Sequence, residues 1–190
     1  MKETEMSSIE YFDAPDLDGT AVQMSEFVVV TADDCEDSAS DEGTNESARV
    51  IGDLLRRVRS NMDMDIVFVA EFVEERRVFR YVDSSNESAD LIESGFSDPL
   101  EETYCMRVVD GRLPLAIPDT SKNSEASELG VTDALNIQSY LSAAIRLPNG
   151  EIFGTLCCIG HNPSTALGSN EVSALKSIAD LVSQHVTRSA

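Results

Sequence analysis

A run of ten residues near the C-terminal end, residues 151–160, restricts the possible folds more than any other part of the sequence. It reads Glu-Ile-Phe-Gly-Thr-Leu-Cys-Cys-Ile-Gly, so apolar side chains occupy both its odd and its even positions. Because successive side chains of a strand point to opposite faces of a sheet, both faces of this strand must be covered. Residues 139–147 are also β-prone, and the intervening Pro148-Asn149-Gly150 contains the Asn-Gly signal of a hairpin turn. The sequence therefore predicts an antiparallel strand pair whose second member lies in the centre of a sheet.

Three further segments have the character of strands. Residues 65–72 and 77–83 flank a polar turn and predict a second antiparallel hairpin. Residues 115–119 predict a short strand, which Pro118 ends or places at a sheet edge. Together with the first pair, these segments predict a mainly antiparallel sheet of about five to six strands.

Amphipathic helices are predicted at both ends of this strand-rich region. Apolar residues recur at helical spacing over residues 46–62 and 169–187, and Ser169 is the expected N-cap of the second helix. The apolar stripes are wide enough to contact both a core and a partner helix. The fold class is therefore α+β, a mainly antiparallel sheet flanked in sequence by a helix at each end.

Shorter helices are predicted between the strands. Asp98 has the properties of an N-cap, Pro99 suits the first helical position, and Glu101 follows three residues after the cap. Gly111 is a natural stop for this helix. Residues 123–134 predict one more short helix.

Negative charge is concentrated in the first quarter of the chain. Residues 1–46 carry 14 acidic side chains and one Lys, a net charge of −13 out of −21 for all 190 residues. Residues 31–43 have almost nothing to bury, whereas residues 24–30 form a short β-prone run. We expect residues 1–46 to be a largely flexible acidic segment and residues 47–190 to form the domain.

Charge and cysteine usage exclude several classes of partner. A chain this acidic, without clustered Lys or Arg, is not expected to bind nucleic acid or an anionic membrane. No apolar run approaches the length of a membrane-spanning helix, and no signal peptide is visible. The cysteines lack metal-ligand spacing, so we expect no metal site and a reducing cytoplasmic location; they are Cys35, Cys105, Cys157 and Cys158.

From Tyr104 onward the sequence resembles a GAF domain, the small-molecule sensor module of many signalling proteins. The order of its parts carries the resemblance: a strand ending in Asp119, a strand led by Tyr140, a turn at Gly150 and a Gly-Thr-Leu-Cys strand. The likeness extends over about residues 47–187. The matching positions are Tyr104, Cys105, Val108, 114–119, Ile137, 140–145, Gly150, 153–157, Glu171 and 175–186.

The resemblance implies a pocket on the sheet face opposite the terminal helices, roofed by short helices and loops. It also implies a homodimer formed through the helices predicted at residues 46–62 and 169–187, which their wide apolar stripes suit. The candidate ligand-binding residues are Tyr104, Cys105, Val108, Asp119, Tyr140, Ser142, Thr155 and Cys157.

Several candidates have a purely structural alternative. Tyr104 and Cys105 suit core packing as well as pocket lining, because free Cys is among the most buried residue types. Asp119 can cap the helix that follows it instead of binding a ligand. Lone His161 and His185 are expected to be surface or loop residues without a metal or haem.

Strand alternation assigns the remaining candidates to a face. Alternation places Tyr140, Ser142 and Ala144 toward the pocket, and Leu141, Ala143 and Ile145 toward the terminal helices. On the next strand it groups the two candidates Thr155 and Cys157 with two neighbours, Phe153 and Ile159.

The resemblance implies a non-enzymatic sensor or regulatory domain in signal transduction, with an unidentified small-molecule ligand. One alternative is a thiol-based reductase of free methionine sulfoxide, because Cys105 and Cys157 could lie on the same side of the pocket. Another is a vestigial GAF domain used only for dimerisation. A bilin is not expected because Met106, not His, follows Cys105, and the cyclic-nucleotide residue set is not recognisable.

Overall fold

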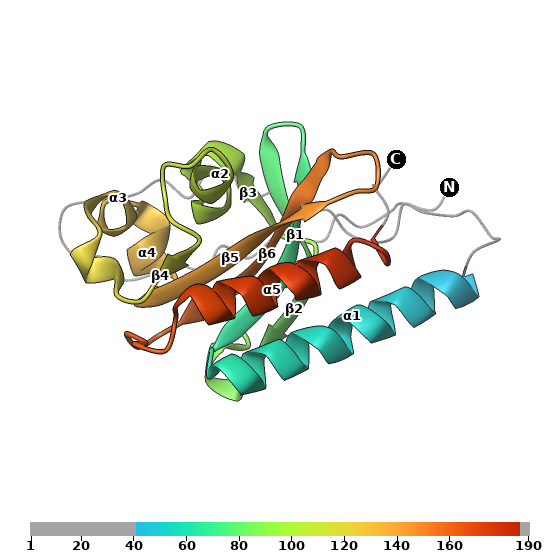
Figure 1. The fold of residues 1–190 in the computed structure, drawn as a ribbon, viewed down its shortest axis with the longest axis horizontal. Coiled ribbons are helices and arrows are strands. Elements are labelled where there is room, and N and C mark those ends of the chain that lie inside the picture. The colour runs from blue at the N-terminus through green and yellow to red at the C-terminus, as the bar shows by residue number, and fades with distance from the viewer. Residues whose placement is uncertain (1–40, 187–190) are drawn as a thin grey trace, which may run out of the picture.

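The structure, a computed structural model, describes residues 41–186, with side chains from Glu46 onward. Figure 1 shows two long helices, α1 (Asp41–Met62) and α5 (Ser169–Val182), lying along one face of a sheet. The short helices α2 (Tyr104–Val109), α3 (Ser124–Ser127) and α4 (Gly130–Ala134) gather on the other side. The β-prone run at residues 24–30 lies outside the described residues, as does the acidic segment up to residue 40.

Six strands form one sheet in the order β3-β2-β1-β6-β5-β4, and every neighbouring pair is antiparallel. This confirms the α+β class and places β6 between β1 and β5, in the interior of the sheet as predicted. The edge strands β3 and β4 are only three and two residues long. The strands are β1 (Ile66–Val73), β2 (Arg76–Ser84), β3 (Ser97–Pro99), β4 (Ala116–Ile117), β5 (Ser139–Arg146) and β6 (Ile152–Gly160).

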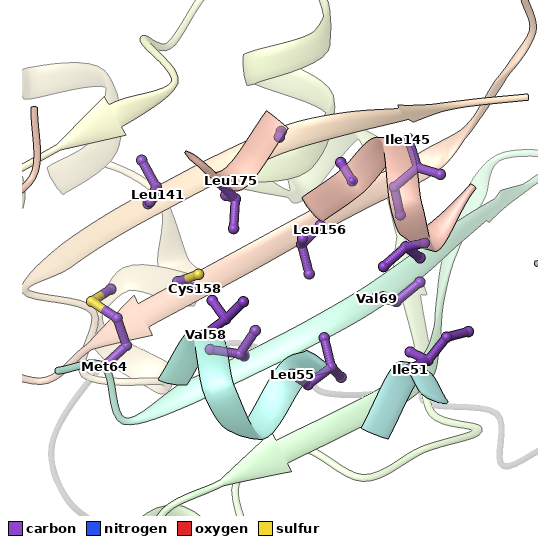
Figure 2. Close-up of a cluster of buried hydrophobic side chains, with 14 of the residues drawn as sticks. Ile51, Leu55, Val58, Met64, Val69, Leu141, Ile145, Leu156, Cys158 and Leu175 are labelled. Carbon is purple, nitrogen blue, oxygen red and sulfur yellow. The ribbon is translucent and has the colours of Figure 1, made fainter. Parts of the chain in front are cut away.

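The terminal-helix face is an apolar core between the sheet and helices α1 and α5. Buried residues on each helix recur three and four positions apart, which aligns them on one stripe. They pack with Leu156 and Cys158 of β6 and with Leu141 of β5 (Figure 2). The helix residues are Ile51, Leu55 and Val58 of α1, and Leu175, Ala179 and Val182 of α5.

The roof face is the opposite side of the sheet, covered by α2, α3 and α4. Its core contains Phe68 of β1, Tyr140 of β5 and Cys157 of β6, packed against Tyr104 of α2. Adjacent residues of β5 and β6 thus belong to separate cores, because strand side chains alternate between faces. Leu141, Ala143 and Ile145 face the terminal helices while Tyr140 faces the roof, as the sequence predicted.

One predicted face is wrong. Phe153 packs in the terminal-helix core and not beside Cys157. The pairing of β5 with β6 shifts there, from Ile145 opposite Gly154 to Arg146 opposite Ile152, so Phe153 is the extra residue of a bulge. A bulge adds one residue to one strand and so reverses the alternation beyond it.

Gly154 allows β6 to approach β1 closely. A Cβ atom built at this position would lie 1.9 Å from the carbonyl oxygen of Ala70 and 2.8 Å from its carbonyl carbon. Backbone atoms cannot move aside as the end of a flexible side chain can. The Gly of the Gly-Thr-Leu-Cys strand is therefore required by sheet geometry.

The expected helix start at Asp98 is wrong. Residues Ser97–Pro99 instead form β3, which pairs with β2, and α2 begins at Tyr104. Its N-cap is Thr103, whose side-chain oxygen accepts a hydrogen bond from the Met106 amide. Strand pairing by the edge segment overrides the local capping signal. Gly111, with φ of +83°, follows the C-cap Asp110 as predicted.

Other element limits also differ from the sequence prediction. The α1 helix begins at Asp41, earlier than residue 46, and α5 ends at Val182, before residue 187. The N-cap of α5 is Gly168, not Ser169, and the Glu171 carboxylate accepts a hydrogen bond from the Gly168 amide. Residues 123–134 form two short helices, α3 and α4, and not one. Within residues 41–186, no helix has the length and apolar character needed to cross a membrane.

Candidate functional site

A group of polar and sulfur-bearing side chains lies buried in the centre of the roof face. We call it the sulfur cluster; it comes from β2, α2, β5 and β6. Five of its members were candidate ligand-binding residues, and each is at most 1% exposed. The cluster consists of Arg77, Cys105, Tyr140, Ser142, Thr155 and Cys157.

Cys157 lies at the centre of this cluster. Its Sγ accepts a hydrogen bond from the Tyr140 hydroxyl at 3.0 Å and lies 3.3 Å from Ser142 Oγ. Its thiol donates to Thr155 Oγ1 at 3.2 Å. The Sγ atoms of Cys157 and Cys105 are 3.5 Å apart, and Tyr140 Oη lies 3.6 Å from Cys105 Sγ. Three hydroxyls therefore lie around Cys157, and Cys105 lies beside it, equally buried.

Arg77 completes the cluster from β2. Its Nη1 lies 3.3 Å from Cys105 Sγ, while Nε donates to Asp98 Oδ1 at 2.9 Å and Nη2 bonds the other carboxylate oxygen. The guanidinium stacks over the Phe79 ring at 4.4 Å and lies 5.5 Å from the Phe68 centroid. The side chain is 3% exposed, so this charge is held by Asp98, by two rings and by a sulfur.

The two sulfurs differ in their protonation. Burial opposes ionisation of Cys105, but the bond with Cys157 and the Arg77 charge outweigh it and lower its pKa to about 5. Burial and the neighbouring Cys105 raise the pKa of Cys157, so this sulfur keeps its proton. Burial also opposes the Arg77 charge, yet Cys105 and Asp98 raise its pKa. The pair therefore carries one negative charge, which faces Arg77.

Tyr140 remains a neutral hydrogen-bond donor in this arrangement. Burial raises its pKa well above the ordinary value, and the charge on Cys105 raises it further. Its ring contacts that of Tyr104, with centroids 4.6 Å apart. The Tyr104 hydroxyl in turn lies 2.7 Å from Thr132 Oγ1 and donates to the Ala126 carbonyl at 3.1 Å. Tyr104 therefore ties the helix that carries Cys105 to both α3 and α4.

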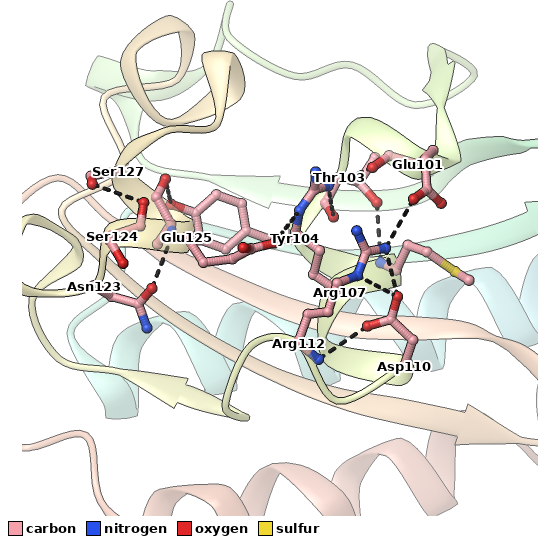
Figure 3. A network of polar contacts seen from close by, with 12 residues as sticks. Glu101, Thr103, Tyr104, Arg107, Asp110, Arg112, Asn123, Ser124, Glu125 and Ser127 are labelled. Carbon is pink, nitrogen blue, oxygen red and sulfur yellow. Dashed lines mark hydrogen bonds and ion pairs between the residues drawn. The ribbon is translucent and has the colours of Figure 1, made fainter.

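A second network joins α2 to α3 and links the turns that flank α2 (Figure 3). Arg107 of α2 donates to Glu125 of α3 at 3.0 Å. Arg112 donates to Asp110 at 2.7 Å and to Glu101 at 3.1 Å, so the turns before and after α2 are joined. These pairs are exposed or partly exposed to water, which screens them, so each contributes little to stability.

Three predicted pocket residues lie outside the sulfur cluster, and Tyr104, described above, is one of them. Val108 packs in the roof core, one helical turn after Cys105. Asp119 accepts bonds from the amide and hydroxyl of Ser121 and pairs with Lys122 at 2.8 Å. These bonds lower the pKa of Asp119 and make it the N-cap of a 3-10 turn at Thr120–Lys122. Asp119 therefore caps this 3-10 turn and not the helix expected near Asn123, since Asn123 is itself the N-cap of α3.

Cys158 and His161 follow Cys157 closely in the sequence but do not belong to the sulfur cluster. Cys158 follows Cys157 directly but lies in the apolar terminal-helix core, where burial raises its pKa. His161 follows β6, and its backbone amide donates to Asp65 at 2.7 Å. Over the described part of the chain, no group of three or more His, Cys, Asp or Glu side chains is arranged to hold a metal.

Sequence reasoning missed Arg77. The sequence pattern predicts only that Arg77 begins the second strand of the hairpin at residues 65–83. Alternation from buried Phe79 puts Arg77 on the same face, since it lies two positions earlier. The available signal was an Arg two residues before an inward-facing Phe on the same strand.

A GAF domain family model matches residues 46–186. Solved structures share the fold at low identity. One is a far-red cyanobacteriochrome photoreceptor, with 19% identity, a TM-score of 0.61 and coverage of 76% of this chain and 88% of that chain. Another is a type II free methionine-R-sulfoxide reductase from Thermoplasma acidophilum, with 14% identity, a TM-score of 0.58 and coverage of 75% and 94%.

A third similar structure is the GAF domain of an Acinetobacter phosphoenolpyruvate-protein phosphotransferase. It shares 16% identity and a TM-score of 0.54, and the match covers 77% of this chain and 91% of that chain. No curated protein sequence matches this chain. The family match spans well over half of the chain and coincides with the whole described fold, so this chain belongs to the GAF domain family.

Proposed function

We propose that this GAF domain is a non-enzymatic regulatory module in signal transduction, which responds to a small molecule on its roof face through helices α1 and α5. One observation carries the proposal. The interior strand β6 places Cys157 in the roof core and its neighbours Leu156 and Cys158 against the terminal helices. A displacement of β6 on the roof face would therefore also change how α1 and α5 pack against the sheet.

The closed packing of the sulfur cluster defines how a ligand would act. Tyr140, Ser142 and Cys157 are at most 1% exposed, so a ligand reaching them must displace α2 or its neighbouring helices. Such a ligand would select an open roof over the closed one. A differential affinity of this kind is what a regulatory domain requires.

A homodimer through α1 and α5 remains part of this proposal. Both helices lie on the same side of the sheet, away from the roof (Figure 1). Leu181 on α5 is 48% exposed, one of two large apolar side chains that stand out in this way among the residues described. A second copy of the chain would cover it.

Native mass spectrometry of the gently purified protein tests the proposal. A dimer with additional mass would support a ligand-binding regulatory module and provide the mass of the ligand. A dimer of bare chain mass would favour the vestigial alternative, in which the roof face is only a packed core. A bare monomer would contradict the dimer and the role of the terminal helices.

A second candidate function is a thiol-based reductase of free methionine sulfoxide. The 3.5 Å contact between Cys105 and Cys157 favours it, since such chemistry needs a thiolate beside a resolving thiol. A structure of similar fold is a free methionine-R-sulfoxide reductase. Turnover of methionine sulfoxide with a dithiol reductant, lost in Cys105→Ser, would establish this function. Absence of turnover in the wild-type protein would leave the regulatory proposal.

A further inference from the structure

We propose that Cys105 and Cys157 are a reversible oxidation site, which a hydroperoxide converts to an intramolecular disulfide that fixes α2 to the sheet. The site does not depend on a bound ligand. It goes beyond the proposed function by giving the roof face a second, chemical input.

The geometry already places the two sulfurs in contact. They are 3.5 Å apart, and a disulfide bond is about 2.05 Å long, so the sulfurs must approach by roughly 1.5 Å. Cys105 lies in α2, a helix of six residues, whereas Cys157 lies in β6 between two neighbouring strands. The short helix can move more easily than the interior strand, so we expect α2 to close the gap.

The charges around the pair assign different roles to its members. Arg77 Nη1 lies 3.3 Å from Cys105 Sγ, which favours the thiolate at that sulfur and makes Cys105 the nucleophile. Cys157 is instead surrounded by the hydroxyls of Tyr140, Ser142 and Thr155. It keeps its proton and is the resolving thiol.

Oxidation of the pair takes place in two steps. The Cys105 thiolate attacks one peroxide oxygen; an S–O bond forms, the O–O bond breaks, and the leaving oxygen takes a proton to become water or an alcohol. Cys157 then attacks the sulfenic sulfur of Cys105; an S–S bond forms, the S–O bond breaks, and hydroxide leaves as water with the Cys157 proton. The two sulfurs together lose two electrons, which the peroxide gains.

Burial selects the oxidant. Both sulfurs are fully buried in the closed structure, so a reagent must enter while α2 fluctuates. Hydrogen peroxide is close to water in size, whereas aromatic disulfide reagents are far larger. The site should therefore react with hydrogen peroxide and resist the large reagents.

Disulfide formation would change the roof as well as the sulfurs. Oxidation removes the anion that faces Arg77, which leaves the guanidinium with Asp98 as its charged partner. Movement of α2 also displaces the adjacent Tyr104, which bonds to α3 and α4. The oxidised state is therefore a second arrangement of the roof face.

Intact-mass analysis of the full chain after hydrogen peroxide treatment tests this inference. A Cys35→Ser background removes a cysteine outside the described residues. We expect a loss of two mass units, two fewer alkylatable thiols after denaturation, and a peptide containing a Cys105–Cys157 bond. A dithiol should restore the original mass. Adducts of oxygen without this bond, or a bond that joins Cys158 instead, would overturn the inference.

Matched variants separate the roles. Cys158→Ser alters the neighbouring thiol on the opposite face and should form the bond at the wild-type rate. Arg77→Met should slow bond formation by at least about tenfold, since it removes the charge that favours the thiolate. An unchanged rate in folded Arg77→Met would contradict the nucleophile assignment. Methionine sulfoxide should not replace hydrogen peroxide, which separates this site from the reductase alternative.

Discussion

The two faces of the sheet bury side chains equally well but use different chemistry. The terminal-helix face is a dry apolar core, in which Cys158 acts as a small hydrophobic residue. The roof face buries a guanidinium, two sulfurs and several hydroxyls in mutual contact. Adjacent residues of one strand therefore experience opposite environments. Burial alone does not define the candidate site; the Arg77 charge does.

The largest effect is expected from a variant that blocks the close approach of β6 to β1, because these two strands contribute side chains to both faces. We expect Gly154→Ala to lower the free energy of unfolding by about 3 kcal/mol or more, because the new Cβ would lie 1.9 Å from the Ala70 carbonyl oxygen. Gly52→Ala is the matched control, since no atom lies within 4 Å of the added Cβ. Urea unfolding should show the control unchanged or stabilised by up to about 1 kcal/mol. Equal stability of both variants would show that β1 and β6 do not approach as described.

Removing the roof-face charge should have the next largest effect. We expect Arg77→Met to cost about 3 kcal/mol, because it leaves the Asp98 carboxylate without its partner. It should also raise the pKa of Cys105, measured by thiolate absorbance near 240 nm. Arg57→Met, at an exposed position of α1, should change stability by less than about 0.5 kcal/mol. If the pKa of Cys105 is the same in both variants, Arg77 does not stabilise the thiolate.

The thiol pair should make stability rise with pH below about 8.5, whereas Cys158 on the other face, whose pKa is raised by burial, should not. The pKa of Cys105 is lowered to about 5, so its contribution is complete above the unfolded value of about 8.5 and disappears as pH falls toward 5. The pKa of Cys157 is raised, so its contribution is present below about pH 8.5 and falls as pH rises further. The pair therefore favours folding most near pH 8.5. The slope should approach about 1.4 kcal/mol per pH unit between pH 5.5 and 8.

Unfolding curves at several pH values measure this slope. The Cys105→Ser/Cys157→Ser double variant should lose the rise between pH 5.5 and 8, whereas Cys158→Ser should keep it. Carboxylates with lowered pKa values, such as Asp119, act at lower pH and are common to all three proteins. A rise of the same size in the double variant would assign it to other groups.

The smallest expected effect concerns a single hydroxyl. Tyr140→Phe removes the donor that lies 3.0 Å from Cys157 Sγ but keeps the ring contact with Tyr104. We expect a loss of about 1 kcal/mol by thermal unfolding, the usual net value of one buried hydrogen bond. Tyr81→Phe, a half-buried tyrosine packed against the terminal-helix core, is the control and should lose less. A larger loss in the control would mean that this hydroxyl contributes nothing particular to the roof face.

The sequence predicted the sheet well because alternation and hairpin turns are local properties. The interior position of β6 and the opposite faces of Tyr140 and Leu141 follow directly from it. Phe153 was misplaced because a bulge depends on two strands together. The start at Asp98 failed for a related reason, since that residue pairs with Arg77 in a neighbouring strand.

The candidate site was only partly predictable. Its residue types and faces could be read from the sequence, but the 3.5 Å contact between Cys105 and Cys157 joins elements 52 positions apart. Such a distance depends on how α2 lies against the sheet. The protonation of Cys105 depends on Arg77, which lies on a third element, β2, 28 positions away along the chain.

The adjacency of Cys157 and Cys158 also bears on how β6 finds its correct pairing during folding. A slip of one residue would turn Cys158 toward the roof face and bring Cys157 into the apolar core, away from its hydroxyl partners Tyr140 and Ser142 on β5. By hydrophobicity alone the two alignments of this strand are nearly equivalent, since both of its faces are apolar. The buried polar group breaks that equivalence, because in only one alignment are its charge and hydroxyls satisfied. The sulfur cluster can thus fix the register of β6 in the sheet.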